Sequence, residues 1–340
     1  FMVLPLLALY AGDMPQATPT LVGLALGIYG LTQAVLQMPF GWLSDWLGRK
    51  PVIVGGLLLF AAGSVLAALA DSVYGLALGR ALQGAGAIAS TVMALAADLT
   101  REEQRTKAMA LIGMSIGLSF AIALILGPVV AAWGGLATVF YLTAVLALLG
   151  IAIVLLLVPT PAATGIEHTE VGTRLALIPR SLGDPALRRL NIGVFTLHFV
   201  LMAIFLLVPE FLESRAGLAR EHHWQVYLPA LVLSIAGMVP MMIVAERGGR
   251  PRQTFIAGVG LLLPAVAVLG FSQAPLLFYA GLWLFFVGFN YLEATLPSLV
   301  SKTVFAGGKG TALGVYSTCQ FLGAFAGGAL GGWTLQHHGS

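Results

Sequence analysis

The sequence predicts an all-α membrane protein built as a bundle of long apolar helices. Hydrophobic residues make up 59% of the chain and charged residues only 9%, whereas soluble domains are about half apolar and about a quarter charged. The mean hydropathy is +0.94. The apolar residues also form long runs, and a run of about 20 residues crosses a hydrocarbon core of about 30 Å as a helix.

Ten full spans are expected, at residues 20–40, 51–70, 73–98, 107–132, 136–158, 190–209, 224–245, 253–271, 275–300 and 310–335. Residues 1–11 are apolar too, but as a helix they cover only about 16 Å at about 1.5 Å per residue. We therefore expect them to form part of a first helix. The 42 glycines suit helices that approach closely in lipid, where small residues form the contact surface.

Basic residues lie in alternate connections between the spans, and this pattern sets the orientation. The other connections hold only Arg215 and Arg220. Loops rich in lysine and arginine stay in the cytoplasm, so the net charge of +3 describes topology and indicates no nucleic-acid partner. The residues on the cytoplasmic side are Arg49, Lys50, Arg101, Arg105, Lys107, Arg174, Arg180, Arg188, Arg189, Arg247, Arg250, Arg252, Lys302 and Lys309.

The one long polar stretch, residues 159–189, contains several prolines and glycines. It predicts a cytoplasmic linker between an N-terminal bundle, residues 1–158, and a C-terminal bundle, residues 190–340. A short amphipathic helix around Arg174–Arg180 is expected to lie at the membrane surface.

The two bundles resemble each other in sequence at offsets of 201 to 204 residues. Three matches support this repeat: Asp45-x-x-Gly48-Arg49 with Glu246-x-x-Gly249-Arg250, Arg105-Thr-Lys-Ala-Met-Ala with Lys309-Gly-Thr-Ala-Leu-Gly, and Gly84 with Gly288. Parallel halves about an axis along the membrane normal are a transporter architecture, with the site near the midplane. Equal halves would have six helices each, with the first partial here and the twelfth absent after Ser340.

The stretch GWLSDWLGRK, residues 41–50, concentrates charge in a chain that otherwise avoids it. Its glycines permit a tight turn and a close helix approach. Two interpretations are open: a surface turn whose charges only set topology, or a contact that controls conformation. The residues concerned are Gly41, Asp45, Gly48, Arg49 and Lys50.

At all five of these positions the stretch resembles the loop signature G-x-x-x-D-x-x-G-R-K of the major facilitator superfamily. LALGRALQG, residues 76–84, resembles the helix 4 motif of this family. Gly127-Pro128 is similar to its antiporter motif, although Ala123, Ala131 and Ala132 stand where glycines are expected. The wider sequence resembles bacterial YajR-type transporters, a drug:proton antiporter branch, over essentially all 340 residues.

The resemblance implies a major facilitator superfamily helix bundle of two six-helix halves in the bacterial cytoplasmic membrane. It also implies that Asp45 faces the start of the eleventh family helix, near residues 307–311, and that Arg49 pairs with Asp98. These residues would then latch the halves together on the cytoplasmic side while the site opens outward.

Three ionisable residues, Arg80, His198 and Glu293, lie inside expected spans. Such a residue costs roughly 2.5–3.5 kcal/mol on insertion scales and indicates function. Arg80 is also compatible with a structural role, and His198 with simple packing. Glu293 is hardest to explain structurally, because a buried carboxyl group must be neutral or paired.

Further polar side chains recur at helical spacing around these three and are expected to line one cavity for protons and substrate. Interhelical hydrogen bonding is the alternative for each of them. They are Tyr29, Gln33, Gln83, Asn290, Tyr316 and Gln320. Other charged residues and histidines lie at loops and ends, where solvation is expected and no metal site is indicated: Asp13, Asp71, His222, His223, His337 and His338.

The leading functional hypothesis is a monomeric secondary transporter, in contact with membrane lipid, that exports small hydrophobic or cationic compounds against protons. The alternatives are an importer or exchanger of a polar metabolite, such as a sugar or organic anion, and a non-transporting receptor. The sequence has no G-x-x-x-x-G-K-[ST] motif, which argues against ATP drive. It shows no nucleophile–base pair or metal cluster, which argues against an enzyme, and no cofactor is expected.

Overall fold

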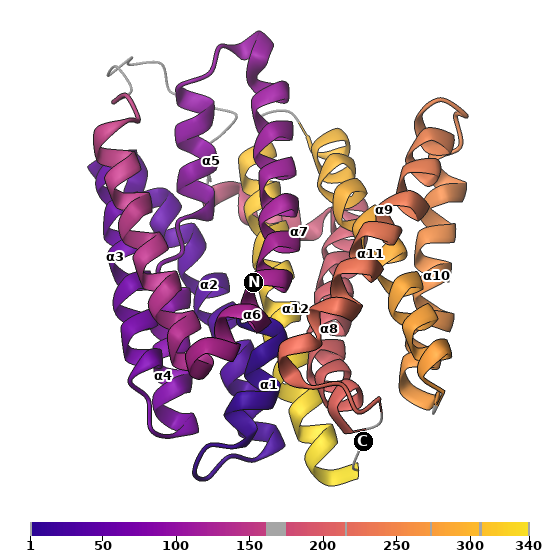
Figure 1. Cartoon of the computed structure of the whole chain (residues 1–340). Coiled ribbons are helices and arrows are strands. Elements are labelled where there is room, and N and C mark those ends of the chain that lie inside the picture. Colours follow the sequence, from indigo (N-terminus) through magenta and orange to yellow (C-terminus); the bar gives the residue numbers. More distant parts are fainter. Residues whose placement is uncertain (1, 161–174, 215, 273, 306–307, 339–340) are drawn as a thin grey trace.

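In the computed structural model, residues 2–160, 175–214, 216–272, 274–305 and 308–338 are described, and every regular element among them is helical. Figure 1 shows the arrangement. The α-helices are α1 (Leu4–Gly12), α2 (Pro19–Leu47), α3 (Arg49–Ala68), α4 (Val73–Ala85), α5 (Ala89–Asp98), α6 (Glu102–Leu156), α7 (Ile178–Gly183), α8 (Pro185–Ser214), α9 (Trp224–Glu246), α10 (Pro251–Phe271), α11 (Pro275–Thr303) and α12 (Lys309–His338). Short 3-10 turns lie at Leu175–Leu177 and Arg220–His222.

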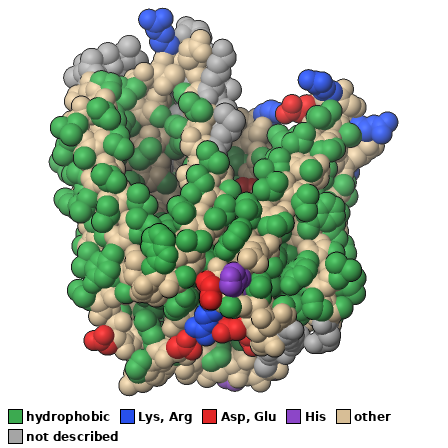
Figure 2. All heavy atoms as spheres, in the orientation of Figure 1, with side chains coloured by type: hydrophobic (Ala, Val, Ile, Leu, Met, Phe, Trp, Pro, Cys, Tyr) green, Lys and Arg blue, Asp and Glu red, His purple; other side chains and the backbone are tan. Residues whose placement is uncertain are grey.

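Seven helices of the described chain are long and apolar enough to cross a membrane. One of them, α6, contains two of the expected spans. Its backbone leaves the helical region at Gly134 and Gly135, where φ of Gly135 is 70°, and this break matches the boundary expected between residues 132 and 136. On the face shown in Figure 2, apolar side chains spread over most of the flank of the molecule, as contact with lipid requires.

The fourth expected span, residues 73–98, is not continuous, so this part of the prediction was wrong. α4 ends at Ala85 and α5 begins at Ala89. A Cβ atom at Gly86 would clash with the backbone carbonyl oxygen of Gly56 in α3, so only glycine allows this approach. Glycine also holds a helix poorly because it loses more backbone entropy than other residues.

The linker is shorter than expected, because α8 begins at Pro185 instead of residue 190. The Asp184 carboxylate accepts hydrogen bonds from the backbone N–H groups of Ala186 at 2.8 Å and Leu187 at 3.1 Å. An N-cap aspartate followed by proline is a helix-start signal. The expected amphipathic helix is partly matched by α7, while residues 161–174 lie outside the described residues.

The close packing of α2 against α12 joins the two groups of helices (Figure 1). A Cβ atom at Gly27 would lie 2.7 Å from the carbonyl oxygen of Phe325, and one at Gly30 would lie 2.7 Å from that of Phe321. Glycine therefore permits this approach, as in other membrane helix pairs. Gly27 and Gly30 lie in the half of α2 that is farther from the basic residues Arg49 and Lys50. Because basic loops lie in the cytoplasm, this contact is in the outer half of the membrane.

The opposite end of the molecule is hollowed between the two groups of helices (Figure 2). This end carries the connection between α5 and α6 and the start of α12 (Figure 1), both on the basic side in the sequence. The structure is therefore closed on the outer side and open on the cytoplasmic side.

The repeat is visible in the backbone at one pair of turns. Gly48, between α2 and α3, has φ 90°, and Gly249, between α9 and α10, has φ 62°, a region that favours glycine. Gly84 and Gly288 lie in α4 and α11, but their neighbours differ. A Cβ atom at Gly84 would face the carbonyl carbon of Tyr29 in α2 at 3.0 Å, whereas one at Gly288 would face the carbonyl oxygen of Gly258 in α10 at 3.0 Å.

Candidate functional site

A hydrogen-bonded chain of three side chains joins helices of the C-terminal half. Glu293 lies in α11, Gln320 in α12 and His198 in α8. The Gln320 amide nitrogen lies 3.2 Å from Glu293 Oε1 and 2.8 Å from His198 Nε2. His198 Nε2 is also 3.8 Å from Glu293 Oε2. Residues more than a hundred positions apart in sequence thus form one polar group in the membrane.

The hydrogen bonds favour a particular tautomer of His198. Its Nδ1 lies 3.2 Å from the carbonyl oxygen of Val194, which can only accept, so Nδ1 carries the hydrogen. Nε2 of the neutral ring then accepts from Gln320. Because the same amide group donates to Glu293, its two hydrogens connect a basic ring with a carboxylate.

The carboxylate of Glu293 is only partly satisfied. Among the described residues its Oε2 atom has no hydrogen-bond partner, and neither does the buried hydroxyl of Tyr316, which is close enough to Glu293 to interact electrostatically. Phe289 packs edge-on against His198 with ring centroids 5.7 Å apart. The site can therefore accept one more proton or hydrogen-bond donor. Asn290 instead donates to Ser234 of α9 at 2.8 Å and takes no part in the chain.

A second polar cluster lies in the N-terminal half. Arg80 Nη1 donates to Gln83 Oε1 at 2.8 Å, and Gln83 Nε2 donates to Ser64 Oγ of α3 at 2.7 Å. The Arg80 guanidinium lies 4.7 Å from the ring centroid of Tyr29. Gln33 Nε2 donates to the Tyr29 hydroxyl at 3.0 Å. All of these partners are neutral.

The two clusters lie at similar depth in the membrane. Tyr29 directly precedes Gly30, Gln320 directly precedes Phe321, and Gly30 and Phe321 pack together across the boundary between α2 and α12. Both clusters therefore lie where the closed outer packing gives way to the cytoplasmic opening.

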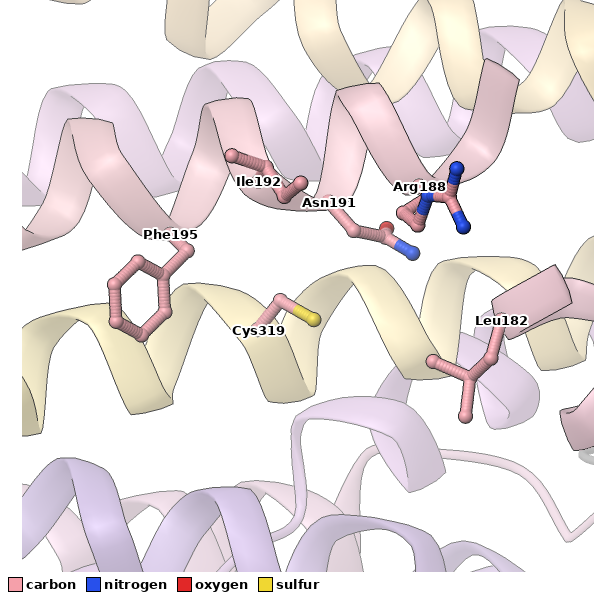
Figure 3. A pocket seen from close by; sticks show the side chains of 6 residues that line it. All are labelled: Leu182, Arg188, Asn191, Ile192, Phe195 and Cys319. Atoms are coloured by element: carbon pink, nitrogen blue, oxygen red, sulfur yellow. The ribbon is translucent and has the colours of Figure 1, made fainter. Parts of the chain in front are cut away.

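An apolar cavity of about 230 Å³ lies between α7, α8 and α12 (Figure 3). Asn191 and Phe195 contribute to it from α8, and their i, i+4, i+7 spacing places them on the same helix face as His198. Cys319 directly precedes Gln320. Phe195 and Cys319 thus place one end of the cavity within one helical turn, along α8 and α12, of His198 and Gln320. Its lining residues are Leu182, Arg188, Asn191, Ile192, Phe195 and Cys319.

The charged motif at residues 41–50 forms a compact ion cluster within the N-terminal half. Arg49 Nε donates to Asp98 Oδ2 at 3.0 Å, and Arg49 Nη1 donates both to Ser44 and to Asp45. The cluster joins α2, α3 and α5, while Lys50 follows in the first turn of α3. A Cβ atom at Gly41 would lie 3.2 Å from Ser90 Oγ, so α2 and α5 approach closely here.

The implied contact of Asp45 with the start of the eleventh family helix is absent from the described part of the chain, where its ion-pair partner is Arg49. Residue 307 lies outside the described residues. The cytoplasmic side is open in this structure, and a contact that closes that side would be separated in such a state.

A second ion cluster, at the outer end, joins the two halves. Arg220 donates to Asp13 Oδ2 at 2.6 Å and to both carboxylate oxygens of Glu213, at 2.9 and 3.1 Å. Asp13 stays solvent-exposed, as expected, and forms this ion pair in addition. The expectation of solvation was wrong for His223, which is buried and bonds through Nε2 to the carbonyl oxygen of Leu218 at 3.1 Å. The burial of His223 depends on packing that leaves no local sequence signal.

Sequence reasoning also missed several hydroxyl groups, namely Ser44, Ser64, Thr143 and Ser234. Single serines and threonines in membrane helices commonly bond to their own backbone, as Ser64 does to the carbonyl oxygen of Phe60 at 2.8 Å. Their second bonds to Arg49, Gln83 and Asn290 depend on which helices are neighbours. Within the described residues no group of three or more histidine, cysteine or acidic side chains is arranged to hold a metal ion.

The all-helical fold and the apolar outer face define a multi-pass membrane protein. Residues 1–328 match the Major Facilitator Superfamily, and the chain belongs to this family of transporters. It is 51% identical over 334 residues to the inner membrane transport protein YajR of Escherichia coli K12, covering 98% of this chain and 73% of that protein. Location in the inner membrane follows from this similarity and from the membrane-spanning helices.

More distant relatives share the fold. The multidrug resistance protein MdtH of Aeromonas hydrophila is 27% identical over 349 residues, covering 99% of this chain and 84% of that protein. A bacterial homologue of the human lysosomal transporter Spinster, solved in an inward-facing and unoccupied conformation, superimposes with a TM-score of 0.77 at 15% identity. That match covers 98% of this chain and 79% of the solved chain.

Proposed function

We propose that this transporter exports small, largely apolar compounds in exchange for protons, and that the proton binds to the Glu293–Gln320–His198 chain. The observation that supports this proposal most directly is that the amide group of Gln320 bonds to both Glu293 and His198. A carboxylate and an imidazole joined in this way can hold a proton in more than one position. The name of the MdtH relatives supports export of drug-like compounds.

The proposed cycle uses the unsatisfied Oε2 atom of Glu293. Protonation at Oε2 gives the carboxyl group an O–H donor, while Oε1 still accepts from Gln320. A substrate with a basic group competes with the proton for the same carboxylate, and such competition couples exchange. The adjoining apolar cavity suits the remainder of the substrate.

The ion cluster of Asp45, Arg49 and Asp98 is proposed to act in the conformational step. Arg49 holds Asp45 at the cytoplasmic end of α2. When the cytoplasmic side closes, the start of α12 approaches this carboxylate, and its free N–H groups favour an anion. Asp45 then latches the closed cytoplasmic side, with Gly41 and Gly48 permitting the helix approach. The protein is proposed to complete this cycle as a monomer.

The test compares Glu293→Gln with the unmodified full-length protein in proteoliposomes, with a substrate chosen from a compound panel in an efflux-deficient strain. Glu293→Gln should lose uphill transport driven by a pH gradient and retain downhill exchange. Glu246→Gln, at the exposed cytoplasmic end of α9, is the matched control and should keep both activities.

Retention of uphill transport by Glu293→Gln would show that the proton binds elsewhere, and His198→Ala would then be the next variant. Loss of both activities by a folded Glu293→Gln protein would assign this residue to substrate binding and contradict its role as the proton site.

A further inference from the structure

Arg80 is the only charged residue in the interior of the N-terminal membrane helices. Every acidic residue of this half lies at a helix end or in a connection. These residues are Asp13, Asp45, Asp71, Asp98, Glu102 and Glu103. The sequence of this half therefore supplies no carboxylate at the depth of Arg80.

The structure supplies none from the other half. Arg80 is 6% exposed, and no carboxylate lies within 4.0 Å of its guanidinium among the described residues. Its contacts are the amide oxygen of Gln83 and the ring of Tyr29, and its Nε atom has no acceptor. Glu293 bonds instead to Gln320.

Neutral contacts do not cancel a buried positive charge. A cation–π contact contributes about 0.5–2 kcal/mol, and the C-terminal dipole of α4 weakens within one turn of its end, which lies five residues away at Ala85. An unpaired cation at membrane depth is costly, and such residues usually have a charged partner. The missing partner of Arg80 is therefore an anion that the described chain does not provide.

We propose that Arg80, oriented by Gln83 and Tyr29, binds the carboxylate of a small organic substrate. A guanidinium offers a planar pair of donors that matches the two oxygen atoms of a carboxylate. This inference rests on the proposed transport function and narrows its substrate class. Glu293 in the opposite half receives the basic group, so the preferred substrate is a zwitterion with an apolar frame.

The experiment measures binding to the purified full-length protein and needs no transport. Thermal unfolding is followed at increasing concentrations of para-aminomethylbenzoate, a zwitterion, or of its methyl ester, a cation, at constant ionic strength. A ligand that binds only the folded state raises the unfolding temperature with its concentration, which gives Kd. The protein should bind the zwitterion at least about tenfold more tightly than the ester, as expected for a charge-assisted pair.

Arg80→Gln should remove this preference and leave the Kd of the ester unchanged, whereas Arg80→Lys should keep part of it as a simple point charge. Arg252→Gln, which changes an exposed arginine in the first turn of α10, is the control and should behave like the unmodified protein. If Arg80→Gln does not fold, the comparison is made between Arg80→Lys and the unmodified protein, each tested with both probes.

Equal binding of both probes, stabilisation by neither, or an unchanged preference in Arg80→Gln would overturn the proposal. A preference abolished by chloride or phosphate at equal ionic strength would identify an inorganic anion site and overturn it as well. Failure of proton coupling in Glu293→Gln leaves this result unaffected, so the two proposals fail separately.

Discussion

Gln320 is the residue that connects the two titratable groups of the candidate proton site. Its neighbours in sequence gave no reason to single it out from other polar side chains in the spans. Glu293 and His198 could be identified from the sequence because ionisable residues are rare in membrane helices. That all three meet could not be predicted, because α8, α11 and α12 bring them together only through tertiary packing.

Replacing Gln320 tests this connection. Gln320→Leu removes the amide but keeps a side chain of similar size, so Glu293 and His198 lose their common partner. We expect uphill transport to fall at least about tenfold, in line with the contribution of positioned acid–base groups, while downhill exchange falls less. Both rates are measured in proteoliposomes, and Gln253→Leu, at an exposed position in the first turn of α10, serves as control. Equal losses in the two assays would count against a role in proton coupling.

Arg49 and Asp98 offer a second test at the scale of single residues. Their side chains are 16% and 14% exposed and 3.0 Å apart. Removing Arg49 leaves Asp98 without its ion-pair partner, whereas removing Asp98 leaves Arg49 paired with Asp45 alone. Arg49→Ala and Asp98→Asn should be non-additive, with an interaction energy of about 0.5–3 kcal/mol in a double-mutant cycle of unfolding. Additive effects would show that the pair is energetically unimportant.

The same variants should shift the conformational equilibrium. Arg49→Ala, Asp98→Asn and Asp45→Asn are each expected to favour cytoplasmic opening. The first two loosen the ion cluster that holds the Asp45 carboxylate in position, and the third removes the negative charge that would bind the start of α12 in the closed state. Labelling of cysteines engineered in the cytoplasmic cavity, in a Cys319→Ala background, measures this shift. Unchanged labelling in all three variants would mean that the motif only sets topology.

At the scale of helices, most elements followed from apolar runs, but their interruptions did not. The break between α4 and α5 occurs where Gly86 lies opposite α3, and a glycine in a sequence does not reveal whether a neighbouring helix approaches it. The start of α8 at Pro185 was recoverable from the Asp184 cap. The tight α2–α12 contact was anticipated only in general terms, from the abundance of glycine.

The α2–α12 contact yields a prediction about conformation. Gly27→Val places side-chain atoms against the carbonyl oxygen of Phe325, where even a Cβ atom would lie at 2.7 Å. The closed outer packing should weaken, and the protein should open more often toward the outer side. Accessibility of a cysteine engineered in the outer half of α2 measures this change. Gly55→Val is the matched control, because a Cβ atom at Gly55 in α3 meets nothing within 4 Å; an equal response in both variants would contradict the explanation.

At the scale of the whole molecule, ion clusters lie at both ends of the bundle. The cytoplasmic cluster around Arg49 lies within one half, whereas Arg220 at the outer end bonds to Asp13 of one half and Glu213 of the other. The positive-inside pattern predicted the orientation but gave no indication of this second cluster. The structure is closed on the outer side, where the Arg220 cluster connects the two halves.

Arg220→Ala should therefore favour opening toward the outer side, opposite to the effect of Arg49→Ala. Partly exposed ion pairs contribute about 0–1 kcal/mol each, so a shift of a few-fold in the conformational equilibrium is expected. Salt should reduce the difference between Arg220→Ala and the unmodified protein, because it screens exposed pairs. A shift toward cytoplasmic opening would be inconsistent with a contact that holds the outer side closed.

The central claim is that Glu293 binds the proton that is exchanged. Infrared difference spectroscopy of the full-length protein in lipid, recorded over a pH titration, measures the carboxylic-acid C=O stretch directly and needs no substrate. The account predicts a band whose amplitude depends on pH, which is absent in Glu293→Gln and altered in frequency in Gln320→Leu. The same pH-dependent band in Glu293→Gln would contradict the account.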